Sequence, residues 1–192
     1  RVYGTTRREC EVPPGIKVLR LDLADDRSII EAVKSVAETE KRIDVLINNA
    51  GMHTGGSIEM SPAKHVKLLM DTNFMGTVLL TREVLPYMRD QGEGIIINLS
   101  SIGGLMGLPF QGFYSATKFA IEGFSEALRM EVERFNIKVV VINPGDFHTN
   151  NSAKRRKFLS TVTEHGPYGE QFAKTLEVIE KDESTGQDPV IL

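Results

Sequence analysis

A tyrosine and a lysine lie four residues apart in the segment GFYSATKFAIEG, residues 112–123, whose pattern predicts a helix. Positions i and i+4 of a helix share one face, roughly 6 Å apart. An ammonium group so close to a phenol favours the phenolate, so Tyr114 is expected to give up its proton more readily than a free tyrosine. The pair Tyr114 and Lys118 therefore predicts a proton donor and the cation that tunes it.

A serine supplies a second group for the same chemistry. Ser101 precedes Tyr114 by thirteen residues and follows the apolar run IIIN. Its hydroxyl can hydrogen-bond the oxygen that exchanges a proton with Tyr114, as in a small oxyanion site. Ser100 competes for this role, but the spacing and the following IGG favour Ser101. These residues predict general acid–base catalysis and leave open what attacks the carbon.

The elements that must position these residues alternate between strand and helix. Strands are predicted at residues 1–6, 16–22, 43–49, 94–101 and 137–145, and helices at residues 26–41, 61–90 (with a bend at Gly76) and 112–135. Such alternation predicts right-handed βαβ units and an α/β fold with a doubly wound parallel sheet. The nearly continuous apolar runs IIIN and VVVIN further predict a three-layer arrangement, with strands covered on both faces.

Polar clusters follow three of the predicted strands. They occupy residues 48–51 (NNAG), 99–104 (LSSIGG) and 143–149 (NPGDFHT). Ligands of doubly wound sheets bind beyond the carboxyl ends of the strands. We therefore expect these clusters to line one crevice together with Tyr114 and Lys118.

The composition excludes several classes of partner. The chain of 192 residues has a length typical of one domain, a net charge of −3 and a single cysteine. It gives no reason to expect nucleic acid or an anionic membrane surface, and no apolar run is long enough to span a bilayer. One cysteine favours a reducing compartment, so a cytoplasmic location is predicted. The histidines lack metal-ligand spacing, so no metal site is predicted. For His53, which follows NNAG, a place in a solvated loop is favoured over a place at the border of the substrate pocket.

The two ends and one internal segment interrupt the pattern. The opening RVYGTTRR is typical of the last part of a strand, and the closing DPVIL of the first turn of a helix, so we expect a piece of a longer protein. Residues 147–186 break the alternation and are predicted to form a substrate lid with a helical part. Four aromatic residues of this lid favour an apolar substrate: Phe147, Phe158, Tyr168 and Phe172.

Taken in order, these motifs resemble those of the short-chain dehydrogenase/reductase superfamily. The set comprises NNAG, a serine thirteen residues before Y-x-x-x-K, and NPG, and the resemblance covers residues 1–149. The stretch SSIGGLMGLPF followed by FYSATKFAIEG is similar to members that act on steroids, retinoids and other lipophilic ketones and alcohols. The resemblance implies one Rossmann-type domain over residues 1–192. It also implies a phosphate-binding glycine-rich loop, T-G-x-x-x-G-x-G, that would precede Arg1.

The resemblance also implies a role for each catalytic residue. The chemistry would be hydride exchange between a nicotinamide cofactor and a carbonyl or secondary alcohol. Tyr114 would be the general acid and base, and Ser101 would orient the substrate oxygen. Lys118 would hold the ribose hydroxyls and assist Tyr114, while Asn73, in DTNFMG, would hold a water of the proton relay.

The cofactor contacts implied by the resemblance come from several segments. The adenosine side would lie along Asn48, Ala50 and Gly51, and the adenine would touch Asp22 and Leu23. The nicotinamide and phosphates would be flanked by Pro144, Gly145 and Thr149.

The first predicted strand favours NADP(H) over NAD(H). Enzymes of this type that prefer NAD place an acidic residue at the end of this strand to hold the ribose 2′-hydroxyl. Here the strand ends YGTTRR, with no acidic residue and with Arg7 beside two threonines. A guanidinium suits a 2′-phosphate.

Two other functions remain open. Related proteins with Y-x-x-x-K act as nucleotide-sugar epimerases or dehydratases, although NNAG disfavours this reading. A protein of the same fold can also bind cofactor without turnover, which the complete Ser–Tyr–Lys–Asn set disfavours. The resemblance further implies a homodimer or homotetramer, paired through the helix that bears Tyr114 and the helix before it.

Overall fold

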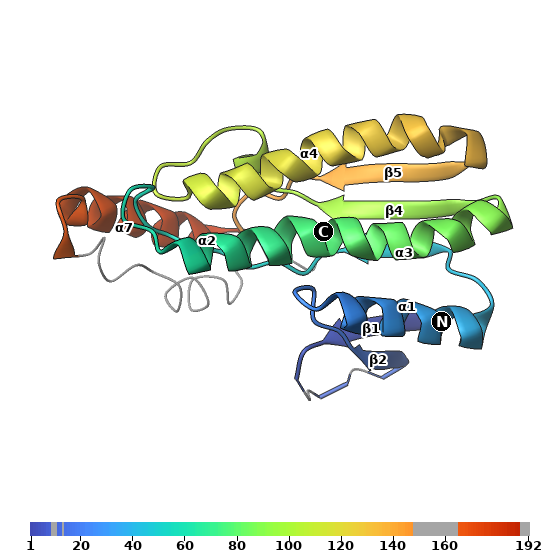
Figure 1. Ribbon diagram of the computed structural model, residues 1–192. Helices are drawn as coiled ribbons and strands as arrows, with labels where there is room; N and C mark the ends of the chain where they lie inside the picture. Colours follow the sequence, from blue (N-terminus) through green and yellow to red (C-terminus); the bar gives the residue numbers. More distant parts are fainter. Residues whose placement is uncertain (9–10, 13, 148–164, 189–192) are drawn as a thin grey trace.

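The computed structural model describes residues 1–8, 11–12, 14–147 and 165–188 (Figure 1). Strands and helices alternate as the sequence predicts. The elements are β1 (Val2–Thr6), β2 (Ile16–Arg20), α1 (Asp26–Glu40), β3 (Val45–Asn48), α2 (Ala63–Met70), α3 (Gly76–Gln91), β4 (Gly94–Leu99), α4 (Gly112–Val132), β5 (Ile137–Ile142) and α7 (Gly169–Thr185). The predicted α/β class is confirmed.

The strands form two parallel ladders. In one, β1 pairs with β2, and Val2 lies opposite Ile16. In the other, the order is β3-β4-β5, and Ile47 lies opposite Ile97. Within the described residues no strand joins β1 to β3, so the hydrogen bonding of the predicted sheet is interrupted there. The pairing of β3, β4 and β5 nevertheless places their carboxyl ends side by side.

The helices α3 and α4 lie along the same face of β3, β4 and β5 (Figure 1). Right-handed crossovers that step in one direction, from β3 to β4 to β5, put their helices on one face. Within the described residues the opposite face carries exposed apolar side chains, Val45, Ile47 and Val140. The described part of the chain thus supplies the helices that cover one face of the predicted three-layer fold.

The core lies between this face and the helices. Its largest cluster of buried side chains comprises Val33, Val84, Met88, Ile96, Leu128, Val132, Ile137 and Val139. A second cluster, of Leu21, Leu23, Ile29 and Ala32, joins α1 to the segment after β2 and meets α3 through Leu79 and Leu80.

The helix predicted at residues 61–90 is divided into two helices near Gly76, where the sequence predicted a bend. A π-helical turn, Asp71–Met75, separates α2 from α3. A Cβ on Gly76 would lie 2.5 Å from the carbonyl oxygen of Leu23, so only glycine lets α3 approach this segment so closely. π-helical turns inside helices are frequent at functional sites.

A stripe of buried positions along α4 determines which of its side chains face the core. The buried positions at helical spacing are Tyr114, Lys118, Ile121, Ser125, Leu128 and Val132. A lysine and a serine therefore occupy positions that an amphipathic helix normally gives to apolar residues. Within the described residues, no helix has the length and apolar character needed to cross a membrane.

Candidate active site

Tyr114 and Lys118 share one buried face of α4, as their spacing predicted. Tyr114 is 4% exposed and Lys118 is 8% exposed. The Lys118 ammonium lies 5.8 Å from the centroid of the Tyr114 ring, and it donates a 2.7 Å hydrogen bond to the carbonyl oxygen of Leu99 at the end of β4. The helix and the strand end thus hold the cation beside the phenol.

Burial changes the acidity of this lysine. It lowers the pKa of Lys118 from 10.5 to about 8, because a charged form is disfavoured away from water, while the negative charge of Glu122 acts in the opposite direction. With a pKa about 8, Lys118 is still mostly protonated at neutral pH. It can therefore act as a cation toward Tyr114.

The turn that carries Ser101 packs against Tyr114. Ser101 begins the 3₁₀ turn Ile102–Gly104, and its hydroxyl accepts a 3.1 Å hydrogen bond from the backbone of Gly103. A Cβ on Gly103 would lie 3.4 Å from the Tyr114 ring. Ser101 is half-buried, whereas the hydroxyl of Ser100 is turned inward, toward Gly104. Of the two serines, Ser101 has the more accessible hydroxyl.

Asn73 connects the loop after β3 to α4. It lies in the π-helical turn and is buried. Its side-chain oxygen accepts from the backbone N–H of Met52 at 2.8 Å, and its amide donates to the carbonyl oxygen of Met52 at 2.9 Å. The same amide lies 3.3 Å from the hydroxyl of Thr117, which donates to the carbonyl oxygen of Tyr114. These side-chain contacts position the loop after β3 beside the start of α4.

His53 lies at this site, which is the less favoured of the two placements that the sequence left open for it. The prediction of a solvated loop is wrong, because the imidazole stacks on the Tyr114 ring with centroids 4.1 Å apart and an interplanar angle of 26°. The clamp of Asn73 on Met52 fixes the backbone immediately before His53. Its position directly after NNAGM was the one signal available, and spacing alone could not show a contact between segments so far apart.

The side chain of Asn48, which was predicted to contact the cofactor, is hydrogen-bonded to other buried side chains. The amide of Asn48 donates to the hydroxyl of Thr81 and to the side-chain oxygen of Asn98. Asn98 in turn donates to Ser125, on α4, at 2.8 Å. This buried chain of hydrogen bonds joins β3, β4, α3 and α4 directly beneath the site.

The other predicted cofactor residues lie at the carboxyl ends of the strands. Ala50 and Gly51 are exposed after β3, and Pro144 and Gly145 follow β5, with Gly145 exposed. Thr149 lies outside the described residues.

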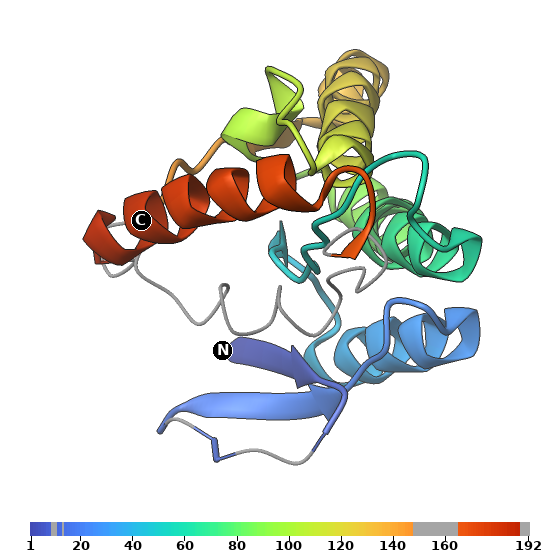
Figure 2. The ribbon, with the colours of Figure 1, turned by 90° about the vertical axis from the view of Figure 1, so that its left-hand side faces the viewer.

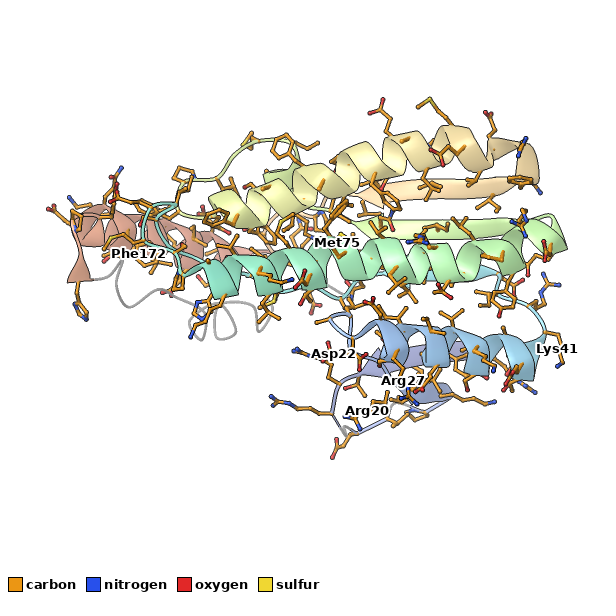
Figure 3. The ribbon with its side chains drawn as sticks, in the orientation of Figure 1. Arg20, Asp22, Arg27, Lys41, Met75 and Phe172 are labelled. Atoms are coloured by element: carbon orange, nitrogen blue, oxygen red, sulfur yellow. The ribbon has the colours of Figure 1, made fainter. Side chains whose placement is uncertain are left out.

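Three further residues come from the β1–β2 ladder. Arg7 is exposed after β1. Asp22 lies after β2, near the start of α1 (Figure 3), and its carboxylate accepts from the backbone of Ala24 at 3.0 Å. Leu23 is buried against Gly76, so its side chain belongs to the core.

The described part of the predicted lid crosses the carboxyl end of the strands as α7 (Figure 2). The buried Phe172 packs against Phe110, with ring centroids 5.3 Å apart. Tyr168 donates a 2.5 Å hydrogen bond to Glu59, and Phe147 forms an isolated bridge with Gln187. The lid residue Phe158 lies outside the described residues.

Parallel α/β architecture with polar residues beyond the carboxyl ends of the strands is typical of dinucleotide-binding proteins. The chain matches the family model of the short chain dehydrogenases over residues 6–160. It therefore belongs to the short-chain dehydrogenase family. This confirms the family, and with it the class of enzyme acting on alcohol and carbonyl groups, that the motifs predicted.

Individual comparisons agree with this assignment. The chain is 46% identical to 3-ketodihydrosphingosine reductase of Bacteroides thetaiotaomicron, over 98% of its own length and 70% of that protein. A short-chain dehydrogenase of Streptomyces avermitilis has a similar structure, with a TM-score of 0.83 and 32% identity over 99% of this chain and 70% of that one. ElxO with NADPH bound is also similar, with a TM-score of 0.67 and 29% identity over 69% of this chain and 54% of that one.

The chain matches only part of its relatives. It spans about half the length of further curated relatives, among them human 17-beta-hydroxysteroid dehydrogenase type 1, to which it is 39% identical over 162 residues. The predicted similarity to members that act on lipophilic ketones and steroids is thereby confirmed.

Proposed function

We propose that this protein is an NADP(H)-dependent oxidoreductase that acts on a carbonyl or secondary alcohol. The observation that carries the proposal is the burial of Tyr114 and Lys118 on one face of α4, beside the turn of Ser101. In the reducing direction, the Tyr114 hydroxyl gives its proton to the substrate oxygen, and in the oxidising direction the phenolate takes it. Lys118 favours the phenolate, and the Ser101 hydroxyl hydrogen-bonds the same oxygen.

The residues at the strand ends fit a nicotinamide cofactor, which when bound supplies or accepts the hydride. The exposed Ala50, Gly51 and Gly145 flank the end of β4, where their small side chains leave backbone uncovered for a flat group. Lys118 would hold the ribose hydroxyls. Asn48, whose side chain is buried, would contribute through its backbone, and Asn73 would hold a water of the proton relay.

The preference for NADP(H) rests on the end of β1. Arg7 is exposed there, and among the described residues 1–8 no acidic side chain is present to receive a ribose 2′-hydroxyl. A guanidinium group can form two parallel hydrogen bonds to a phosphate, in bidentate geometry. The binding of NADPH by the similar protein ElxO supports the same assignment.

The proposed substrate is a lipophilic ketone with a long chain. Three apolar side chains of the segment after Ser101 are exposed near the site, Ile102, Leu105 and Met106. The contact of Phe110 with the buried Phe172 holds α7 against this segment. The name of the Bacteroides relative, a 3-ketodihydrosphingosine reductase, supports this substrate class.

The cofactor proposal is tested by measuring the binding of NADPH and NADH to the purified protein through dihydronicotinamide fluorescence. NADPH is expected to bind at least tenfold more tightly. Arg7→Ala should remove most of this difference, while the control Arg134→Ala, at another exposed arginine, should leave it unchanged. Equal affinities for both cofactors in the unaltered protein would contradict the preference.

The catalytic proposal is tested with Tyr114→Phe and the reduction of 3-ketodihydrosphingosine. The variant is expected to lose about 10²–10⁴-fold in kcat, the usual contribution of a general acid, while it still binds NADPH. Turnover that survives this substitution would contradict the role of Tyr114. An epimerase, a dehydratase or a non-catalytic binding protein would show no net oxidation of NADPH even before substitution.

The assembly and location follow from the same proposal. Exposed apolar residues in the turn before α3 and on α4, namely Met75, Phe119 and Met130, favour pairing of these helices between two copies. A homodimer or homotetramer is therefore expected. Size-exclusion chromatography coupled to light scattering measures the molar mass of the assembly. The cytoplasmic location stays a prediction from the single cysteine.

A further inference from the structure

The buried ammonium of Lys118 has a charged neighbour one helical turn away. Glu122 follows Lys118 by four residues, on the helix face that also carries Tyr114, and it is half-buried. Burial lowers the pKa of Lys118 to about 8, and the charge of Glu122 raises it. Because a neutral lysine gives no electrostatic help to Tyr114, the charge of Glu122 bears on the chemistry of the site.

A side chain from the end of β5 holds Glu122 in place. The amide of Asn143 donates a 2.5 Å hydrogen bond to the Glu122 carboxylate, and it lies 3.3 Å from the carbonyl oxygen of Ser101. Asn143 directly precedes Pro144 and Gly145. One amide thus ties the helix of the Tyr–Lys pair to the turn of Ser101 and to the loop proposed to flank the nicotinamide.

The other groups around the Tyr–Lys pair include one more titratable side chain, His53, which stacks on the Tyr114 ring from the loop after β3. From β4, the carbonyl oxygen of Leu99 accepts the hydrogen bond of Lys118, and from α4 the Tyr114 ring lies beside this lysine. From β5, the neutral Asn143 reaches Glu122. The charged side chain that acts on the pKa of Lys118 is Glu122.

We propose that Glu122, held by Asn143, is a positioning residue that keeps Lys118 protonated beside Tyr114. This inference rests on the proposed function. Glu122 acts through Lys118 and touches no reacting atom. Its spacing, its bond to Asn143 and the burial of the lysine carry the assignment.

The first test compares Glu122→Gln with Glu126→Gln, a matched change at an exposed position one turn further along α4. Without the charge of Glu122, Lys118 loses its proton at lower pH. The alkaline limb of kcat/KM for NADPH-dependent ketone reduction should therefore move down by about one pH unit, as expected for unit charges one helical turn apart in a partly buried site. The pH profile of Glu126→Gln should coincide with that of the unaltered protein, and Glu122→Asp should retain most of the unaltered profile.

A second measurement does not need turnover. The NMR chemical shift of the side-chain nitrogen of Lys118, assigned by its absence from Lys118→Met, reports the ionisation of Lys118. Glu122→Gln should shift the ionisation of Lys118 to lower pH, and Asn143→Ser, which frees the carboxylate but keeps its charge, should shift it less in the same direction.

The outcomes separate the two proposals. Absence of activity in the unaltered protein would overturn the proposed function, and the titration of Lys118 would still report on Glu122. If Glu122→Gln leaves both the pH profile and the titration unchanged, the positioning role is wrong. A shift of equal size in Glu126→Gln would also overturn it, because any negative charge on α4 would then suffice.

Discussion

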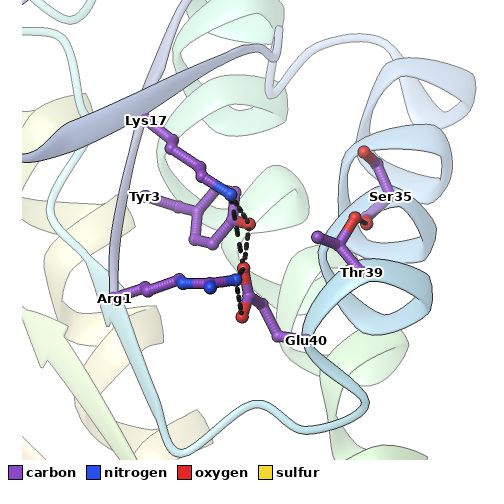
Figure 4. A network of polar contacts seen from close by, with 6 residues as sticks. All are labelled: Arg1, Tyr3, Lys17, Ser35, Thr39 and Glu40. Atoms are coloured by element: carbon purple, nitrogen blue, oxygen red, sulfur yellow. Dashed lines mark hydrogen bonds and ion pairs between the residues drawn. The ribbon is translucent and has the colours of Figure 1, made fainter.

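The half of the molecule that contains β3, β4, β5, α3 and α4 differs from the half that contains β1, β2 and α1 in where it keeps its polar groups. In the first half they are buried: Asn98 is fully buried and Lys118 nearly so. In the second half the polar groups lie at the surface. There Glu40, at the end of α1, accepts hydrogen bonds from Arg1 and Tyr3 and forms an ion pair with Lys17 (Figure 4). The two networks lie at opposite ends of the strands.

The difference shows what burial does to a charge. For Lys118, loss of water is the main influence, and it lowers the pKa to about 8. For Glu40, hydrogen bonds from Arg1 and Tyr3 are the main influence, and they lower the pKa from 4.5 to about 2. The first effect makes a side chain responsive near neutral pH, which suits catalysis. The second fixes a charge, which serves to attach β1 and β2 to α1.

The same substitution in both halves gives the largest expected contrast. Lys118→Met removes the buried cation beside Tyr114, so we expect kcat for ketone reduction to fall about 10²-fold or more. Lys17→Met removes an exposed cation that is 3.5 Å from Glu40, and activity should stay within about twofold because exposed ion pairs contribute little. Steady-state kinetics with NADPH measure both. Similar losses of kcat in the two variants would contradict the contrast between a buried catalytic lysine and an exposed one.

Gly76 joins the two halves, and a pair of glycine substitutions tests that junction. A methyl group at Gly76 would meet Leu23 at 2.5 Å, so Gly76→Ala should lower the free energy of unfolding by about 1–3 kcal/mol through overpacking. Gly123, on α4, has nothing within 4 Å of a Cβ. Gly123→Ala should therefore raise that free energy by about 0.5–1 kcal/mol, through helix propensity. Urea denaturation measures both, and a stable Gly76→Ala would contradict the close approach.

Glu40→Gln should give the smallest effect, a decrease in melting temperature whose size depends on pH. The pKa of Glu40 in the folded state, about 2, is below the ordinary 4.5, so its ionised form stabilises the fold above pH 4.5. This stabilisation is lost as the pH falls from 4.5 toward 2. In Glu40→Gln, the deficit in melting temperature should be present at neutral pH and shrink in this acid range.

A control on the same helix sharpens this result. Glu31 pairs with Arg27 four residues earlier, and both side chains are exposed. Glu31→Gln should leave the melting temperature nearly unchanged at every pH. A deficit in Glu40→Gln that is the same at neutral and acid pH would show that the carboxylate charge is not the source.

Local spacing allowed much of the site to be predicted. The interval of four between Tyr114 and Lys118 is enough to place both on one face of α4, because helix geometry is local. The order of motifs predicted the family, and the strand–helix alternation predicted the α/β class. The division near Gly76 also follows from the sequence.

Contacts between distant segments could not be predicted in this way. The stacking of His53 on Tyr114 depends on how Asn73 clamps Met52, which spacing along the chain does not encode. The inward use of Asn48 depends on Asn98, fifty residues away. Which strand faces are covered depends on the side to which successive crossovers turn.

The sequence by itself determined which residues can do chemistry, and in which order they follow the strands. Only the tertiary structure decided how that chemistry is tuned. The pKa of Lys118 is set by its burial against β4 and by the charge of Glu122, which Asn143 holds from the end of β5. Desolvation and electrostatic interaction depend on distances in space, and packing fixes those distances.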